Sequence, residues 1–429
     1  MLAKPLSTGF IATLFLLLFA NCSYAKDKTH ISGFGSIVGY QADGRDLGFR
    51  SNISSSRQGR SGDIELLELS LVGLQVNYQI NSKWELVSQA VVRHERTEDL
   101  TDRIKLATIN YTPNAEWLIR VGRFFPKLYL LSDTRYIGYA QDTAYPVVDF
   151  YAQIPLASLD GVDIGYQTRA GKFLFTANAY SGTSEVWADI DGSNVKTPLK
   201  DIHGVNFGVE FDNWLFRAGY TVATHDGFDT DAEVEMLLNL LASPPPALGI
   251  PGWPGAQDML QAYRIKNTDF SYSSLAFEYS EIDSYWRGEL GKLATDSFLA
   301  PDSVAGYIQY TKRVGKVSPF VIVSAIDTKK GYTPRDLPPP ELLHALSVAL
   351  QQDLTQPFHL LRNSLNVGYK QHSLIGGMRI DWDEQIAIKA QYERKWVGDG
   401  GAGLWQRDPL APIPDRVANI MTLGIDWVF

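Results

Sequence analysis

The residues that could carry out covalent or metal chemistry form no recognisable pattern. The seven histidines are scattered along the chain, and it contains neither a G-x-S-x-G nor an H-E-x-x-H motif. The single cysteine, Cys22, excludes a disulfide framework and any cysteine-based metal site. We therefore expect no enzymatic activity, no cofactor and no metal. The 39 basic and 48 acidic residues give a net charge of −9, so a nucleic-acid partner is not expected either.

Charged side chains offer a different chemistry, the electrostatic selection of solutes. The segment 126–157 carries acids and bases close together, namely Lys127, Asp133, Arg135, Asp142 and Asp149. If side chains alternate along strands, further charges would line the same space; these are Arg120, Asp163, Glu210, Arg217, Glu278, Arg287, Glu289, Arg379, Asp381, Lys389 and Glu393. Acids on the segment facing bases on a wall would create a field across a pore. Alternatively, these side chains are solvated and paired with one another.

The first 25 residues predict a cleaved export signal. Lys4 precedes the apolar run 10–20, and Ser23-Tyr24-Ala25 forms a small-x-small cleavage site. The run is too short for a transmembrane helix, which needs about 20 residues. Cleavage would leave one domain, residues 26–429, with a charge of −10 and no cysteine, and this charge weakly favours cations as solutes.

The elements that must position these charges are indicated by alternation with a period of two. Val205, Phe207, Val209 and Phe211 alternate with polar residues or glycine, and similar patterns occupy 214–222 and 386–393. Because side chains alternate across a strand, each segment has one apolar and one polar face. The fold class is therefore all-β. Local alternation is compatible with a soluble sandwich and with a membrane barrel, whose apolar faces meet lipid.

Three features favour the barrel. Aromatic residues such as Trp84, Trp117 and Trp214 stand at expected strand ends, where membrane–water interfaces would lie. Tight turns alternate with long connections, as in barrels with short periplasmic turns and long external loops. The last strand carries apolar residues at every second position, namely Met421, Leu423, Ile425, Trp427 and Phe429. This terminal strand resembles the assembly signature of outer-membrane barrels.

The pattern predicts about sixteen antiparallel strands. They are 29–41, 63–80, 83–96, 103–112, 115–125, 158–169, 172–181, 202–212, 213–224, 269–281, 284–296, 302–313, 317–327, 373–383, 385–396 and 417–429. Segment 363–371 could add part of a strand, so 14 or 18 strands remain alternatives. A sixteen-stranded barrel leaves an aqueous channel, so we expect no hydrophobic core inside it.

The segment 126–157 is the long connection that follows the fifth strand. This position, with Val121-Gly122-Arg123-Phe124-Phe125-Pro126 and Ile137-Gly138-Tyr139-Ala140, resembles the general porins of Gram-negative bacteria. The resemblance implies that 126–157 folds into the lumen and narrows it. It also implies an outer-membrane location and a homotrimer.

Two other external connections, 224–268 and 328–372, contain helical patterns. Residues 229–243 begin with acids and are stopped by Pro244-Pro245-Pro246, and residues 338–354 begin with three prolines, which are tolerated at a helix start. These short helices could form a lid over the pore, pack on each other at the external mouth, or contact a neighbouring subunit. Further long connections are expected near 41–62, 183–201 and 397–416.

These observations predict an outer-membrane porin whose partners are membrane lipid and small hydrophilic solutes or ions, which pass by diffusion. Alternatives are a substrate-selective channel for an anion, sugar or organic acid gated by the loop helices, a non-conducting adhesive barrel, and a soluble periplasmic β-protein.

Overall fold

The computed structural model describes residues 28–43, 47–52, 62–94, 100–154, 156–190, 193–226, 232–263, 268–295, 302–328, 336–365, 370–398, 404–407 and 416–429. The expected signal at 1–25 lies outside these residues. No helix in the described part of the chain is long and apolar enough to cross a membrane.

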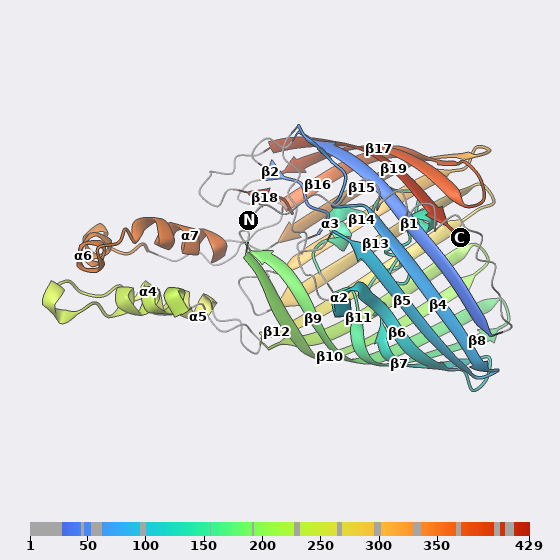
Figure 1. Cartoon of the computed structure of the whole chain (residues 1–429), viewed down its shortest axis with the longest axis horizontal. Helices are drawn as coiled ribbons and strands as arrows, with labels where there is room; N and C mark the ends of the chain where they lie inside the picture. The colour runs from blue at the N-terminus through green and yellow to red at the C-terminus, as the bar shows by residue number, and fades with distance from the viewer. Residues whose placement is uncertain are drawn as a thin grey trace.

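Sixteen long strands form one closed antiparallel barrel (Figure 1). Their bounds are β1 (Thr29–Ala42), β4 (Leu71–Asn81), β5 (Trp84–Arg93), β6 (Ile104–Tyr111), β7 (Trp117–Phe124), β8 (Leu159–Ala170), β9 (Phe173–Ile190), β10 (Ser193–Phe211), β11 (Trp214–His225), β12 (Thr268–Ser280), β13 (Ser284–Thr295), β14 (Ser303–Lys312), β15 (Val317–Thr328), β16 (Lys370–Asp381), β17 (Ile386–Val397) and β19 (Arg416–Val428). Each strand pairs with the next, and β1 closes the barrel by pairing with both β4 and β19. The predicted strand number and fold class are confirmed for the described residues.

The outer face of the barrel is apolar. Phe207 is 61% exposed, Val323 61% and Leu423 69%, and their neighbours Asn206, Ser324 and Thr422 point inward. Aromatic pairs join adjacent strands near one end of the barrel, with ring centroids 4.4–4.7 Å apart; they are Trp84–Tyr111, Trp117–Tyr166, Trp214–Tyr279 and Trp286–Tyr310. Such rings favour a membrane–water interface. The expected apolar belt and aromatic girdle are therefore present.

Three expectations about the connections need correction. The segment 183–201 is a continuation of the β9–β10 hairpin rather than an irregular loop. The expected strand 63–80 is divided into the two-residue β3 (Ile64–Glu65) and β4. Segment 363–371 adds no strand within the described residues, because α7 (Thr355–Leu365) occupies its start and β16 begins at Lys370.

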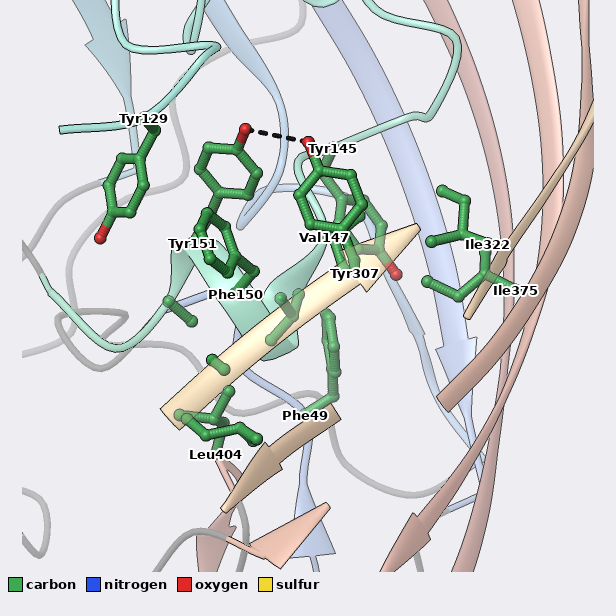
Figure 2. Close-up of a cluster of buried hydrophobic side chains, with 14 of the residues drawn as sticks. Phe49, Tyr129, Tyr145, Val147, Phe150, Tyr151, Tyr307, Ile322, Ile375 and Leu404 are labelled. Atoms are coloured by element: carbon green, nitrogen blue, oxygen red, sulfur yellow. Dashed lines mark hydrogen bonds between the residues drawn. The ribbon is translucent and has the colours of Figure 1, made fainter. Parts of the chain in front are cut away.

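The expectation that the barrel contains no hydrophobic core is wrong. A buried cluster inside it joins residues of the 126–157 segment to inward-facing residues such as Ile322 and Ile375 (Figure 2). Phe49 and Leu404 add to this cluster from two other external connections, which pair through β2 (Leu47–Gly48) and β18 (Gln406–Arg407). The reason is that β15 is apolar on both faces: Phe320 and Ile322 point inward, whereas Val321 and Val323 point outward.

The helices of the two long external connections form a separate helical headpiece. It consists of α4 (Ala232–Ala242), α5 (Gly255–Tyr263), α6 (Pro340–Leu350) and α7, and it projects beyond one end of the barrel (Figure 1). Leu238, Trp253, Leu342 and Phe358 share its buried core. The expected helices are thus present, and those of the two connections pack on each other.

Candidate functional site: a loop anchored inside the barrel

The segment 126–157, here named the constriction loop, leaves β7 after Phe124 and returns to the wall at β8. It contains two short helical turns, η1 (Gly138–Ala140) and α3 (Val148–Tyr151), and α3 lies within the barrel (Figure 1). The turn η1 lies against β1 and β19, and α3 lies against β14, β15 and β16. These contacts place both turns of the loop against strands of the barrel wall.

Asp149 fixes the α3 turn to the wall. Its carboxylate accepts hydrogen bonds from Ser324 Oγ at 2.8 Å, from Ser373 Oγ at 2.6 Å and from the Gln371 side chain. Lys395 Nζ lies 3.4 Å from Asp149 Oδ1 and 2.8 Å from Glu393 Oε2. These ionic side chains are fully buried, so Asp149 is an anchor and does not line open water.

The environment of Asp149 keeps it ionised. Burial alone would raise its pKa, but the Lys395 ammonium and the hydrogen bonds from Ser373, Ser324 and Gln371 hold the pKa below its ordinary value. The anchor is therefore complete at neutral pH. It is lost only as the pH falls below the usual titration range of aspartic acid.

Two wall glutamates bind tyrosines and main chain of the loop. Glu289 on β13 accepts hydrogen bonds from the hydroxyl groups of Tyr151 and Tyr307 and from Leu130 N at 2.8 Å. Glu393 on β17 accepts one from the Tyr145 hydroxyl. Each carboxylate is buried. Buried acids of this kind are stable only when their oxygens are satisfied, so the bonds from Tyr145, Tyr151 and Leu130 hold the loop in register with the wall.

Asp142 is held by uncharged donors. Its Oδ2 atom accepts hydrogen bonds from the Tyr285 hydroxyl, from Gln309 Nε2 at 3.1 Å and from Thr311 Oγ1 at 2.8 Å. These residues lie on β13 and β14. Asp142 therefore also contacts the wall directly, and no gap separates it from the strands.

Three wall cations bind carbonyl oxygens of the loop. Arg217 donates to Lys127 O and to Tyr129 O, Arg379 to Tyr139 O and Gln141 O, and Lys389 to Gly138 O at 2.6 Å and Thr143 O at 2.9 Å. The expected arrangement of bases on the wall and acids on the loop exists, but most of these groups are in contact. They attach the loop instead of creating a field across open water.

The approach of the loop to β1 and β19 is closest at Gly138. Lys389 Nζ lies 2.8 Å from Asp426 Oδ2, and Ser36 donates to the same carboxylate. A Cβ atom at Gly138 would overlap with Asp426 and Ser36. Glycine is therefore required here by close approach of the main chain to the wall.

The remaining predicted site residues lie outside these anchors. Arg120 pairs with Asp163 at 2.7 Å, and Arg287 pairs with Glu278 at 2.7 Å. Glu210 is exposed next to the end of β10. Asp133 is exposed, whereas Lys127 and Arg135 are partly buried. Burial lowers the pKa of Lys127.

Sequence reasoning missed most of the uncharged anchoring residues and one of the cations, Lys395. Tyr145, Tyr151, Tyr285, Tyr307, Ser324, Ser373 and Lys395 were not expected to contribute. Their positions on inward faces of strands could have been read from the alternation, but their partners lie up to 248 residues away in sequence. Within the described residues, no group of three or more His, Cys, Asp or Glu side chains could hold a metal ion.

A closed sixteen-stranded barrel with an apolar outer belt and an internal loop after its fifth strand is the fold of outer-membrane porins. Comparison with solved structures agrees. The *Salmonella typhi* OmpF structure (complex with daunomycin) superposes with a TM-score of 0.53 at 10% identity, covering 94% of this chain and 97% of that chain. The anion-selective porin of *Comamonas acidovorans* gives 0.51 at 12% identity, covering 94% and 99%.

A third neighbour, the outer-membrane channel DcaP of *Acinetobacter baumannii*, gives a TM-score of 0.53 at 10% identity and covers 94% of this chain and 99% of that chain. No protein-family model matches the chain, and no curated protein matches it. At these identities the likeness establishes the fold. The chain is thus a transmembrane β-barrel of the porin type, as the sequence predicted.

Proposed function

We propose that this protein is a porin in the outer membrane of a Gram-negative bacterium, through which small hydrophilic solutes or ions diffuse passively. The observation that carries the proposal is a constriction loop held inside a sixteen-stranded barrel, with its side-chain hydrogen bonds concentrated on one part of the wall. Its hydrogen bonds to wall side chains reach β11, β13, β14, β15, β16 and β17. Toward β5 and β6 the loop packs through Phe125 and Tyr136, which share a buried cluster with Val91 and Leu106.

The inward face of that wall is suited to water. Gln75, Asn77, Glu85 and Asn110 form a hydrogen-bonded polar group on β4, β5 and β6. Asn178 on β9 adds a bond to Asp163 on β8. A barrel of sixteen strands is too wide for its own side chains to fill. We therefore place the permeation path between the loop and these polar side chains of the wall, beside the contact that Tyr136 makes with β5 and β6.

The mechanism is diffusion through a narrowed opening, without covalent chemistry or cofactor. The loop reduces the cross-section, and its anchors keep that cross-section constant. A solute must enter without binding so tightly that it cannot leave. Buried ion pairs and hydrogen bonds serve this purpose because they remove the freedom of the loop while leaving few charged groups to trap a solute.

We further propose an export signal at 1–25, assembly guided by the terminal strand, and a homotrimer. The side chains of Met421, Leu423, Ile425 and Phe429 are exposed on the outer face of β19, where they are accessible to a partner during insertion. A trimer form exists for OmpT of *Vibrio cholerae*, a neighbour with a TM-score of 0.51 at 13% identity. Crosslinking in native membranes followed by electrophoresis would test the trimer.

The test of the channel is electrical. Purified protein inserted into planar lipid bilayers should produce discrete, roughly ohmic conductance steps. A folded, heat-modifiable barrel that inserts without producing steps would overturn the proposal. A variant lacking residues 127–154 should give larger steps, because the loop no longer narrows the barrel.

A non-conducting barrel is the second candidate, and the internal hydrophobic cluster favours it. Phe49, Tyr145, Phe150 and Leu404 are buried together inside the barrel. Such packing would close the mouth of the barrel. The helical headpiece would then serve for adhesion. In that case the wild type gives no steps, and only the loop-deletion variant conducts.

A further inference from the structure

The lipid-facing surface of the barrel contains an oblique groove. Its volume is about 950 Å³, it crosses strands β10 to β16, and its lining is almost entirely apolar. The groove follows one line of register partners, namely Phe207, Ala218, Leu275, Leu290, Gly306 and Ala325. Leu275 and Leu290 are 60% and 52% exposed, so the groove opens to the outside of the barrel. The small residues of the line leave room between the larger side chains.

The groove rises from one end of the barrel toward the other. Phe207 lies close to the tight turn that follows β10. At the other end of the line, Ala325 lies near the external end of β15, and its register partner His372 lies near the start of β16. Barrel strands tilt by about 35–45°, so a line across them runs obliquely through the membrane. The groove is therefore shaped for an extended hydrocarbon chain that enters from the external side.

Polar side chains stand at the external end of the groove. His372 lines it, Lys370 lies on the same face of β16, and Arg394 lies on the same face of β17; all three are exposed. The His372 ring stacks on its register partner Trp396, with centroids 5.0 Å apart. The Arg394 guanidinium lies 5.5 Å from the centroid of the same indole. We name Lys370, His372, Arg394 and Trp396 the polar cap of the groove.

The residues that face Arg394 across the sheet are uncharged. They are Leu374 on β16 and Asn419 on β19. Asn419 in turn donates from its side chain to Asp43 at 2.7 Å, so that carboxylate is engaged by the amide. Arg394 therefore presents its charge to the surroundings of the barrel.

The other cation of the polar cap has an acid opposite it. Asp327 on β15 faces Lys370 in the register, and both side chains are exposed. An arginine on the outer face is tolerated at the depth of the lipid headgroups and is costly at the midplane. Arg394 is thus the residue of the polar cap that is suited to an anionic group of a lipid headgroup.

We propose that the groove and its polar cap bind one phosphate-bearing lipid of the external leaflet. One acyl chain lies along Leu290, Gly306 and Ala325, and the phosphate lies on Arg394 and His372. A guanidinium matches phosphate oxygens with two parallel hydrogen bonds, and an imidazole offers an N–H donor in either protonation state. Trp396 supplies the amphipathic ring that favours the membrane–water interface. The inference rests on the transmembrane fold and does not depend on conduction.

The experiment is native mass spectrometry of the full-length protein purified in detergent. Two probes with identical acyl chains are added in turn, dioleoyl phosphatidic acid and dioleoylglycerol, which lacks the phosphate. The wild type should retain one molecule of phosphatidic acid and bind dioleoylglycerol more weakly. Arg394→Gln should weaken the binding of phosphatidic acid by about tenfold or more, because a charge-assisted hydrogen bond is lost.

Two further variants separate the groove from general charge effects. Ala325→Trp fills the groove without changing any charge, and it should weaken the binding of phosphatidic acid as well. Lys172→Gln removes a cation from an exposed ion pair in a tight turn at the other end of the barrel, and it should bind phosphatidic acid like the wild type. Heat-modifiable mobility shows that the barrel of each variant is folded.

Several results would overturn the inference. These are a folded wild type without a lipid adduct, equal binding of the two probes, or an equal loss in Lys172→Gln and Arg394→Gln. The groove would instead be an interface between copies of the chain if Ala325→Trp abolished crosslinked oligomers and the wild type bound no lipid. The proposed channel is tested separately, since a barrel that binds lipid without conductance steps would refute the channel alone.

Discussion

Replacing Lys395 with methionine tests the anchor of the α3 turn. Lys395 is the ammonium shared by Asp149 and Glu393, and all three side chains have no exposed area. Lys395→Met leaves two buried carboxylates without a cation. Removing one partner of a buried ion pair costs about 3–5 kcal/mol. Since about 1.4 kcal/mol corresponds to a tenfold change in an equilibrium, the fraction of molecules with a released turn should rise roughly 100- to 4,000-fold.

Asp149→Asn should destabilise the anchor of the α3 turn less than Lys395→Met does. The lysine then keeps Glu393 at 2.8 Å, and the amide oxygen still accepts from the wall hydroxyls. The cost should be about 1–3 kcal/mol, the range for imperfectly satisfied buried polar groups. In the double variant Asp149→Asn, Lys395→Met, one orphaned carboxylate is gone. Its destabilisation should be smaller than the sum of the single effects by about 1–3 kcal/mol.

The assay combines two measurements. Current noise and open-channel conductance report whether the loop is released from the wall. The temperature at which the folded barrel loses its compact electrophoretic mobility reports the stability of the barrel. Lys395→Met should increase noise and conductance more than Asp149→Asn, and Lys172→Met, at an exposed ion pair, should change neither. Equal effects of the two anchor variants, or strictly additive effects in the double variant, would refute the assigned ion-pair geometry.

Three other changes have distinct expected results. Gly138→Val should displace the loop from β1 and β19, because its side chain would overlap with Asp426; conductance should rise, and an unchanged conductance would contradict the close approach. Leu342→Asp should open the core of the helical headpiece, so limited proteolysis should cleave the headpiece faster while the mobility of the barrel is preserved; protection equal to wild type would contradict the shared core. The pKa of Asp149 lies below its ordinary value, so the anchor should persist from neutral pH to about pH 5 and weaken only below about pH 4, which current noise recorded across this range would reveal.

Much of the wall could be predicted from sequence because lipid imposes strict alternation. The expected strand 284–296 is β13 (Ser284–Thr295), and 213–224 is β11 (Trp214–His225). The pattern fails in the β9–β10 hairpin, where the strands have 18 and 19 residues. A membrane crossing requires only about 9–11 residues per strand. The residues beyond this length need no apolar outer face, so the alternation pattern did not predict them as strand.

The interior was harder to predict. The continuous apolar run Phe320-Val321-Ile322-Val323 is a sign that both faces of a strand are buried, and it could have indicated an internal core. The placement of the loop followed from its position after the fifth strand. The wall residues that bind the loop could not be predicted, because bonds such as Asp149–Lys395 join residues 246 apart in sequence.

Cysteine labelling tests the central claim, that the outer face of the strands meets lipid while water fills the space beside the loop. The chain has one cysteine, Cys22, and it lies in the expected signal, so single cysteines introduced elsewhere would report without interference. In bilayers, a charged, membrane-impermeant thiol reagent should modify Asp133→Cys and reduce the current, and it should leave Leu423→Cys unmodified. Rapid modification of Leu423→Cys together with an inert Asp133→Cys would contradict the account.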